Sequence, residues 1–376
     1  MFHTKTLNLP YLPQLEQKCK INLSLSIFKN GGDPMITQNL TDSLYSRTTS
    51  DEWVGAVPKI FRSAVDKVRD LVSSDPATNP HPPSRWIKQH VRTDHDDQWE
   101  SQLQDLQVQS KLLDIIVLED ESEAWKCVRY SLPSGQLAFL IRAGCDTLPS
   151  PVNLARWKVQ HDTRCGLCHQ PRCTLAHILS ACQKALTLGH YTWRHDCVLK
   201  CIARHLAINT EKSEQELLLR VDLPGMLTEQ STIPASVCTT NLRPDIFLQC
   251  GESRGIVGEL TIPNNSTTNL ENAKIRKSTK YLGLVADLSE HFEDVDLVTL
   301  EVGALGHYHP HDLMAAMSIL MPGTSKRTIK SLLTDIVRTV VNASYTVFSN
   351  RRVEDDWAHK PFIYYHHDKR VYEIPI

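Results

Sequence analysis

Apolar and polar residues alternate with two different periods in the last third of the chain. Residues 243–250 and 255–262 form short apolar runs separated by Gly-Glu-Ser-Arg, a pattern that predicts two strands joined by a hairpin. Residues 295–303 predict a further strand. Residues 268–288 and 325–348 carry apolar side chains at helical spacing instead. This region is therefore expected to combine helices with a sheet.

Each of these two predicted helices has a defined apolar stripe. In the first, Thr268 and Glu271 have the spacing of a capping box, which predicts that the helix begins there. Its expected buried face consists of Leu270, Ala273, Tyr281, Leu284, Val285 and Leu288. The expected buried face of the second helix consists of Ile329, Leu332, Leu333, Ile336, Val340 and Val341.

The first 150 residues show helical patterns interrupted by turns. Residues 52–72 and 97–117 have near-helical apolar spacing, and the Pro-rich segment 73–84 separates them as a linker. Residues 131–157 contain two short predicted helices punctuated by Leu-Pro-Ser and Pro-Ser-Pro turns. Residues 1–50 are rich in Thr, Ser, Asn and Pro without a sustained period, and are expected to be poorly ordered.

Composition is typical of an intracellular globular protein. The chain has 376 residues, 41% of them hydrophobic, which is enough for two or three compact units. It contains no run of 18 apolar residues and no signal-peptide pattern, so a soluble protein without a membrane partner is expected. Its 11 cysteines are spread thinly, unlike a secreted disulfide framework, and this leaves reduced thiols for binding metal.

The charge balance is informative only locally. The formal net charge of −2 gives no general argument for nucleic-acid binding. Residues 156–205, however, contain eight Lys and Arg against two Asp, a local excess of +6. We therefore expect phosphate contacts to come from this segment, which includes Arg194 and Lys200.

The same basic segment contains a cluster of cysteines and histidines. Cys165, Cys168, His177 and Cys182 follow the pattern Cys-x2-Cys-x8-His-x4-Cys, which supplies three thiolates and one imidazole for a tetrahedral Zn²⁺. Because four protein ligands leave no open position, the zinc is expected to be structural. Three questions stay open: Cys173 could replace one ligand, His169 could do so as well, and buried thiols could simply fill space.

The predicted hairpin brings two carboxylates together. If residues 251–253 form a three-residue loop, Cys250 faces Arg254, and counting outward places Asp245 opposite Glu259. Directly opposed residues of an antiparallel pair share one face, with Cβ atoms about 4.5–5.5 Å apart. Two carboxylates this close repel each other, which either raises the pKa of one of them or calls for a cation between them, and Mg²⁺ fits the second case.

The helix that follows the hairpin adds lysines at a regular spacing. Lys274, Lys277 and Lys280 lie three residues apart, and Tyr281 stands beside the last of them. A lysine near the metal could position an attacking water or balance charge on a scissile phosphate. The alternative is a solvated helix face beside an outward-facing glutamate. The order acid, acid, lysine favours a Mg²⁺-dependent nuclease.

Six short motifs in order resemble one family. They are DTLPSPVNLARW, CGLC with TLAHILSAC, YTWRHDCVL, RPDIFL with VGELTIP, RKSTKYLGLVADL and EVGALG. Between about residues 120 and 350 the chain resembles the C-terminal half of the polyprotein of non-LTR (LINE) retrotransposons that carry a restriction-like endonuclease. In that family a CCHC zinc knuckle follows a helical thumb and linker, and a PD-(D/E)xK endonuclease nicks target DNA to prime reverse transcription.

The resemblance implies an α+β multidomain architecture. Its expected segments are a poorly ordered N-terminus (1–50), a helical thumb- and linker-like module (51–150), a zinc knuckle with a basic helix (151–205), a restriction-like endonuclease (206–352) and an atypical C-terminal tail (353–376). It also implies a DNA target, the RNA of the element as a second partner, and a nuclear location if the protein is expressed.

The resemblance also assigns roles to individual residues. Asp245 and Glu259 correspond to the Mg²⁺ ligands, and the lysine motif falls at Lys277 and Lys280, with Lys277 the first choice. Thr261 stands where the second acid is usually followed by a lysine, in keeping with a family that supplies this lysine from the helix. At the end of the zinc knuckle, Arg194 and His195 match a basic pair expected to contact nucleic acid.

No polymerase is expected in this chain. A polymerase palm needs an apolar strand that ends in paired aspartates, whereas the aspartate runs at residues 94–97 and 353–356 have polar surroundings. The chain is thus expected to be a fragment of such an element, acting as a Mg²⁺-dependent DNA nickase. The alternative is a catalytically inactive remnant that still binds nucleic acid.

Overall fold

The computed structural model describes residues 101, 123–224, 226–227, 230–358, 360–366 and 369–373. Packing divides the chain into two compact units, 1–110 and 111–376, and the fold below is that of the second. The N-terminal segment 1–50, the predicted helix 52–72 and the linker 73–84 lie outside the described residues, as does the predicted helix 97–117 apart from Ser101.

A mixed four-stranded sheet lies at the centre of the described unit. The strands follow the order β1 (Leu217–Val221), β2 (Ile246–Cys250), β3 (Arg254–Thr261) and β4 (Asp294–Glu301). The first three strands pair antiparallel, whereas β3 and β4 pair parallel. With the helices around it, this sheet makes the fold α+β, as the sequence pattern predicts.

The β2–β3 hairpin has the predicted register. Cys250 pairs with Arg254 and Ile246 pairs with Gly258, so the next residues outward are Asp245 and Glu259. Gly251 opens the loop with φ of +60°, a conformation that costs glycine little because it has no Cβ. The loop therefore sets the register that brings the two acids to neighbouring positions.

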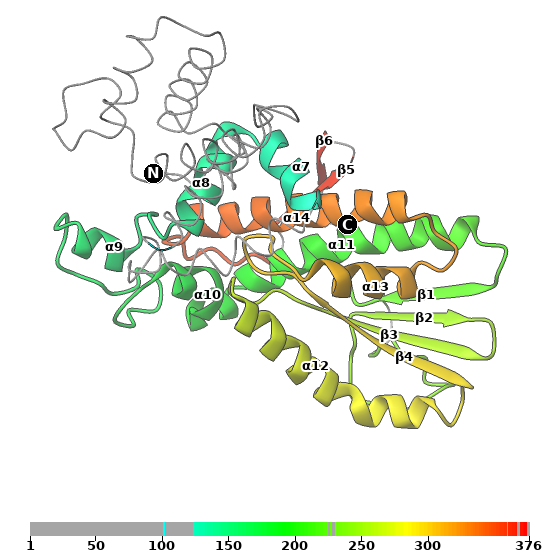
Figure 1. The fold of residues 1–376 in the computed structure, drawn as a ribbon. Coiled ribbons are helices and arrows are strands. Elements are labelled where there is room, and N and C mark those ends of the chain that lie inside the picture. The colour runs from blue at the N-terminus through cyan, green and yellow to red at the C-terminus, as the bar shows by residue number, and fades with distance from the viewer. Residues whose placement is uncertain are drawn as a thin grey trace, which may run out of the picture. The chain divides into compact units, whose positions relative to one another are not determined.

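Helices cover both faces of the sheet (Figure 1). One face is covered by α12 (Thr267–Leu288), which connects the parallel strands β3 and β4. The other face packs on α11 (His190–Lys212) and α13 (Pro310–Leu320), and α14 (Lys326–Ser349) packs against these two helices. The strands supply alternate residues to the two faces, as a pleated strand requires.

The predicted apolar stripes are buried almost completely. All six predicted residues of the α14 stripe lie in the core, and so do five of the six in α12, with Val285 only partly buried. The predicted capping box is wrong. Ser266 has an extended backbone, and its hydroxyl accepts a hydrogen bond from the backbone N–H of Asn269 at 3.1 Å. Ser266 therefore caps α12, and Thr268 lies inside the first turn.

Shorter helices precede the sheet. They are α7 (Glu123–Ser131), α8 (Ser134–Gly144), α9 (Pro151–Arg156), the π-helix η2 (His177–Ala181) and α10 (Gln183–Thr187). One apolar core runs from Ala124 through the cysteine segment, α11 and the sheet to Ile363. This core extends across positions 150, 205 and 352, and the domain boundaries expected there stay predictions.

The C-terminal segment folds back onto the same core. Its hairpin consists of β5 (Phe362–His366) and β6 (Lys369–Glu373). The indole N–H of Trp193 in α11 donates to the backbone carbonyl of Pro361 at 3.1 Å, and Trp357 stacks on His190 with ring centroids 4.1 Å apart. Within 353–376, the predicted atypical tail, the described residues up to Ile363 are thus part of the packed unit.

Candidate metal centre and candidate active site

The four predicted zinc ligands converge in the structure. The ligand atoms of Cys165, Cys168, His177 and Cys182 all lie within 4.8 Å of one another. The sulfur atoms of Cys165 and Cys182 are 3.8 Å apart, and Cys168 Sγ is 3.3 Å from His177 Nε2. This Cys3His cluster could bind a metal such as zinc, for which three thiolates and one imidazole are a suitable donor set.

The turn that contains Cys165 and Cys168 presents backbone N–H groups to sulfur. The N–H of Leu167 points at Cys165 Sγ at 3.4 Å, and the N–H of His169 donates to the carbonyl of Cys165 at 3.0 Å. Burial acts to raise the pKa of the Cys165 thiol. The backbone N–H groups of Cys168 and Leu167 and the nearby His177 more than offset burial, so this pKa lies below its ordinary value. The turn thus favours the thiolate that a metal needs.

Two other residues of the segment lie outside this cluster. His169 is exposed at a turn with φ of +60°, and Cys173 is buried, but neither belongs to the group of converging ligand atoms. Burial raises the pKa of the Cys173 thiol above its ordinary value, which favours a neutral packing residue. The geometry therefore favours the original four ligands over either replacement.

A tyrosine of α11 makes hydrogen bonds to the backbone around His177 and Cys182, two of the candidate metal ligands. The hydroxyl of Tyr191 donates to the carbonyl of His177 at 3.1 Å or of Ile178 at 2.9 Å, and it accepts from the N–H of Cys182 at 3.0 Å. These carbonyls belong to the π-helix. One phenol therefore orients two of the four ligand residues.

The two predicted acids meet at the edge of the hairpin. The backbone N–H of Asp245 donates to Glu259 Oε2 at 3.2 Å, and the N–H of Leu260 donates to Asp245 Oδ2 at 2.7 Å. Both residues are buried, at 8% and 3% exposure. Each carboxylate thus accepts a hydrogen bond from the backbone of the opposing segment. These bonds orient both side chains without a ligand.

The helix α12 brings the predicted lysines to the same point. Lys277 Nζ donates to Glu259 Oε1, and its side chain is 20% exposed. Lys280 lies 4.0 Å from the same oxygen, is 45% exposed, and donates to the hydroxyl of Tyr281 at 2.8 Å. Lys274 is instead paired with Asp312 at 2.7 Å. Of the three, Lys277 has the closest contact with the carboxylates.

His195 joins this carboxylate site from α11. Its Nε2 lies 3.2 Å from Asp245 Oδ2, and its Nδ1 lies 3.0 Å from Asp196 Oδ1. Burial acts to lower the pKa of His195, but the negative charge of Asp245 and the hydrogen bonds to both aspartates raise it to about 10. The resemblance implied that His195 contacts nucleic acid, whereas the structure places it against a predicted catalytic acid.

Arg194, the neighbour of His195, is a correction to the predicted nucleic-acid surface. Its side chain is 2% exposed, and its guanidinium donates to Ser344 Oγ at 3.2 Å and to the carbonyl of Ile262 at 3.4 Å. Burial lowers its pKa to about 10. A side chain enclosed in this way has no free surface for a phosphate, so Arg194 packs α11 against α14 and the end of β3.

Lys200, the third predicted contact residue, lies on α11 at an intermediate exposure. Its ammonium group is 4.7 Å from the centre of the Phe362 ring. Burial, with a smaller effect from the charge of Arg204, lowers the pKa of Lys200. This aromatic contact ties Lys200 to the C-terminal hairpin.

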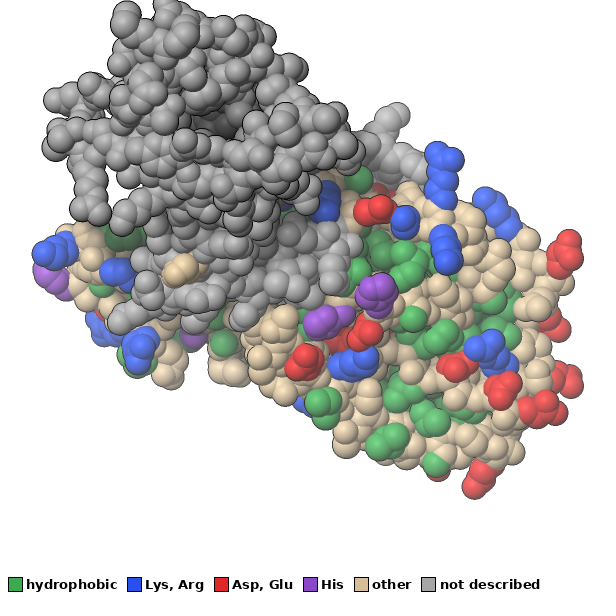
Figure 2. Space-filling view, viewed as in Figure 1, with side chains coloured by type: hydrophobic (Ala, Val, Ile, Leu, Met, Phe, Trp, Pro, Cys, Tyr) green, Lys and Arg blue, Asp and Glu red, His purple; other side chains and the backbone are tan. Residues whose placement is uncertain are grey.

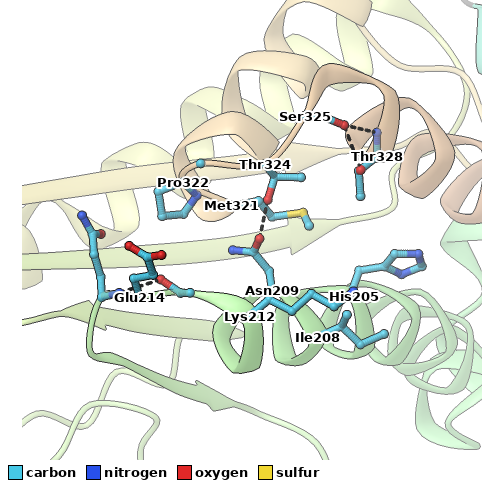
Figure 3. A pocket seen from close by; sticks show the side chains of 13 residues that line it. His205, Ile208, Asn209, Lys212, Glu214, Met321, Pro322, Thr324, Ser325 and Thr328 are labelled. Atoms are coloured by element: carbon cyan, nitrogen blue, oxygen red, sulfur yellow. Dashed lines mark hydrogen bonds between the residues drawn. The ribbon is translucent and has the colours of Figure 1, made fainter.

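A separate cavity opens elsewhere in the fold. A volume of about 620 Å³ lies between the C-terminal end of α11 and the loop that enters α14 (Figure 3). Asn209, Lys212 and Thr324 are among its lining residues, and Ser325 caps α14 there by accepting from the N–H of Thr328 at 3.2 Å. None of the predicted catalytic residues lines this cavity.

Comparisons with protein-family models and with curated proteins gave no match to this chain. Among the described residues, none of the helices combines the length and the apolar character needed to cross a membrane.

Proposed function

We propose that this protein is a Mg²⁺-dependent DNA endonuclease that nicks one strand, and that its Cys3His centre is a structural zinc knuckle beside the nuclease. The observation that carries the proposal is the meeting of Asp245, Glu259 and Lys277 on a hairpin and the next helix. These side chains come from three separate segments of the chain. If the strand and the helix simply carried solvated polar faces, nothing would require the three side chains to lie together away from solvent.

The donor set suits a hard divalent cation. Two carboxylates lie at opposed positions, and Asp245 Oδ1 takes part in no hydrogen bond among the described residues. Magnesium held by Asp245 and Glu259 would supply Lewis acidity and an activated water for attack on a phosphodiester. Lys277 would then lie where positive charge can stabilise the phosphate in the transition state. His195 would hold Asp245 in place through a charge-assisted hydrogen bond.

The wider proposal follows the resemblance to non-LTR retrotransposon endonucleases. The fold would be of the PD-(D/E)xK class, since a mixed sheet with α12 on one face presents the two acids and the lysine in the expected order. The target would be DNA, a second partner would be the RNA of the element, and the place of action would be the nucleus.

Nicking of supercoiled plasmid by purified protein, with and without Mg²⁺, tests this proposal. Asp245→Ala and Glu259→Ala should abolish nicking, and Lys277→Ala should lower its rate by roughly 100-fold or more, the usual scale for a group that stabilises developing charge. Lys274→Ala is the matched control, because Lys274 lies on the same helix but pairs with Asp312. It should nick at the wild-type rate.

Folding must be checked for each variant by circular dichroism. A folded, zinc-loaded wild-type protein that binds DNA but shows no Mg²⁺- or Mn²⁺-dependent nicking would contradict the nuclease proposal. The inactive binding remnant would then be the better description.

A further inference from the structure

Trp157 is an exposed tryptophan at the end of α9, eight residues before Cys165 in the sequence. It follows directly after α9 and is 42% exposed, and Val159 in the same turn is 68% exposed. A tryptophan buries a large apolar area when it finds a partner, so leaving its ring in water is unfavourable. A flat exposed ring of this kind offers a surface on which another flat group can stack.

Basic residues flank Trp157 in the sequence. Residues 156–172 contain Arg156, Lys158, Arg164 and Arg172 against Asp162 alone, which is already paired with Arg164 at 2.9 Å. Figure 2 shows Lys and Arg side chains, with a histidine, gathered over α9 and the segment after it. The local charge therefore suits a polyanion.

Backbone hydrogen bonds keep the basic turns close to α9. The N–H of Cys173 donates to the carbonyl of Thr163 at 2.7 Å, and the N–H of Val152, at the start of α9, donates to the carbonyl of Cys173 at 3.3 Å. Arg172, directly before Cys173, is thereby fixed near α9 rather than on an independent loop. Cys165 and Cys168, two of the candidate metal ligands, lie in the same segment, so a bound metal would stabilise these turns.

The backbone of these turns gives an independent indication. Lys158, His169 and Arg172 have φ values of +59°, +60° and +60°, a region that glycine enters without the cost a Cβ brings. At all three positions the chain carries an exposed basic or imidazole side chain instead of glycine. Each turn thus holds such a side chain outward at some conformational cost, as is common at binding sites.

We infer that Trp157, Lys158 and Arg172 form a binding platform for single-stranded nucleic acid, on which an unpaired base stacks on Trp157 while the two basic side chains contact phosphates. Only an unpaired base offers a free face to the indole, because the bases of a duplex are already stacked on each other. The platform deepens the proposed nucleic-acid function, on which it rests, but it requires no cleavage.

Fluorescence anisotropy with labelled 12-nucleotide probes tests this inference, with single-stranded DNA, RNA of the same sequence and duplex DNA in the absence of Mg²⁺. Trp157→Ala should weaken binding of single strands by roughly fivefold to a hundredfold, the effect of losing one stacked base. It should leave the slope of log affinity against log salt unchanged, because no phosphate contact is lost. Trp157→Phe should restore most of the affinity.

The basic turns allow a second readout. Lys158→Gly and Arg172→Gly should each weaken binding of single strands and flatten the salt slope by about 0.7 for one lost phosphate contact. Neither substitution should lower the unfolding temperature, because glycine adopts a positive φ without the steric cost that a Cβ brings. Leu186→Ala is the control for exposed apolar surface, since Leu186 is 49% exposed on α10, and it should bind like the wild type.

Unchanged single-strand affinity in Trp157→Ala would overturn the platform, and so would an equal loss for duplex and single strand. Comparing the RNA and DNA probes shows which strand the platform prefers. Glu259→Ala separates the two proposals. If it abolishes nicking but keeps the Trp157-dependent binding, both hold, and if the wild type does not nick but Trp157 still matters, only the platform holds.

Discussion

Glu301 ends β4 with a buried carboxyl group. Its side chain is 8% exposed, and among the described residues its Oε1 has no hydrogen-bond partner. Burial raises the pKa of this group above its ordinary value. The folded state therefore binds the proton more tightly than the unfolded state does, and ionising Glu301 lowers stability.

This burial predicts how stability depends on pH. The free energy of unfolding should fall as pH rises from the unfolded pKa of a glutamate through the raised folded pKa of Glu301. Glu301→Gln should remove that part of the fall and should unfold at a higher urea concentration at pH 7. Glu252→Gln, in the exposed hairpin loop, is the control. Identical pH profiles for Glu301→Gln and wild type would contradict the prediction.

Arg194 gives a second prediction at the scale of one side chain. Arg194→Ala should lower the free energy of unfolding by about 2–4 kcal/mol, because it leaves a cavity and unpairs Ser344 Oγ and the carbonyl of Ile262. Urea denaturation measures this. For the folded fraction of this variant, the slope of log affinity for nucleic acid against log salt should equal that of the wild type. A flatter slope would show that Arg194 contacts a phosphate.

At the scale of elements, α11 connects the two candidate sites. Tyr191 in its first turn orients the metal centre, and His195, one turn later, contacts Asp245. The helix packs on α14 and on the sheet, so these contacts are made by a rigid element rather than a loop. Neighbouring turns at the N-terminal end of α11 therefore serve the two candidate sites.

Tyr191→Phe tests the role of the phenol in the metal centre. The variant leaves the N–H of Cys182 and the carbonyls of His177 and Ile178 without this partner, so it should lose zinc to a chromophoric chelator roughly 10-fold faster or more. Nicking should be less affected than zinc retention. Tyr345→Phe is the control, since Tyr345 also packs against the core but is remote from the metal ligands in sequence and contacts Phe139. Equal rates of zinc loss in the two variants would remove Tyr191 from the metal centre.

At the scale of the whole 111–376 unit, the metal centre and the sheet share one core. Cys165, Cys173 and Cys182 belong to the same apolar cluster as the strands and α14. Loss of a structural metal should therefore destabilise the unit as a whole, because metal binding is coupled to folding.

Chelation provides the measurement. Protein treated with a strong chelator should unfold at a lower temperature in a single transition, observed by both far-ultraviolet circular dichroism and tryptophan fluorescence. Added Zn²⁺ should restore the original transition, and Mg²⁺ should not. An unchanged unfolding temperature, or a second transition confined to the metal centre, would show that the cluster and the sheet fold independently.

Part of this structure could be read from local sequence. The hairpin register followed from a three-residue loop, because a loop length fixes which residues face each other. The convergence of the four Cys and His residues that could hold a metal followed from their spacing, and the stripe of α14 from its helical period. Each of these features depends on residues close together in the chain, where backbone geometry alone leaves few alternatives.

Other features depended on contacts that no local pattern contains. The strand β1 forms by pairing with β2, and Arg194 is buried by contacts with α14 and the end of β3. His195 reaches Asp245 because α11 packs on the sheet. The choice of Ser266 over Thr268 as helix cap was decided by the extended backbone where the chain leaves β3. In the +6 segment, charge alone could not separate Arg194, enclosed by α14, from the exposed Lys158 and Arg172. The sequence by itself determined which chemical groups are available and how near neighbours pair, since those follow from composition and backbone period. Only the tertiary structure decided which charges are buried and which face solvent, because desolvation depends on every element that packs around a side chain.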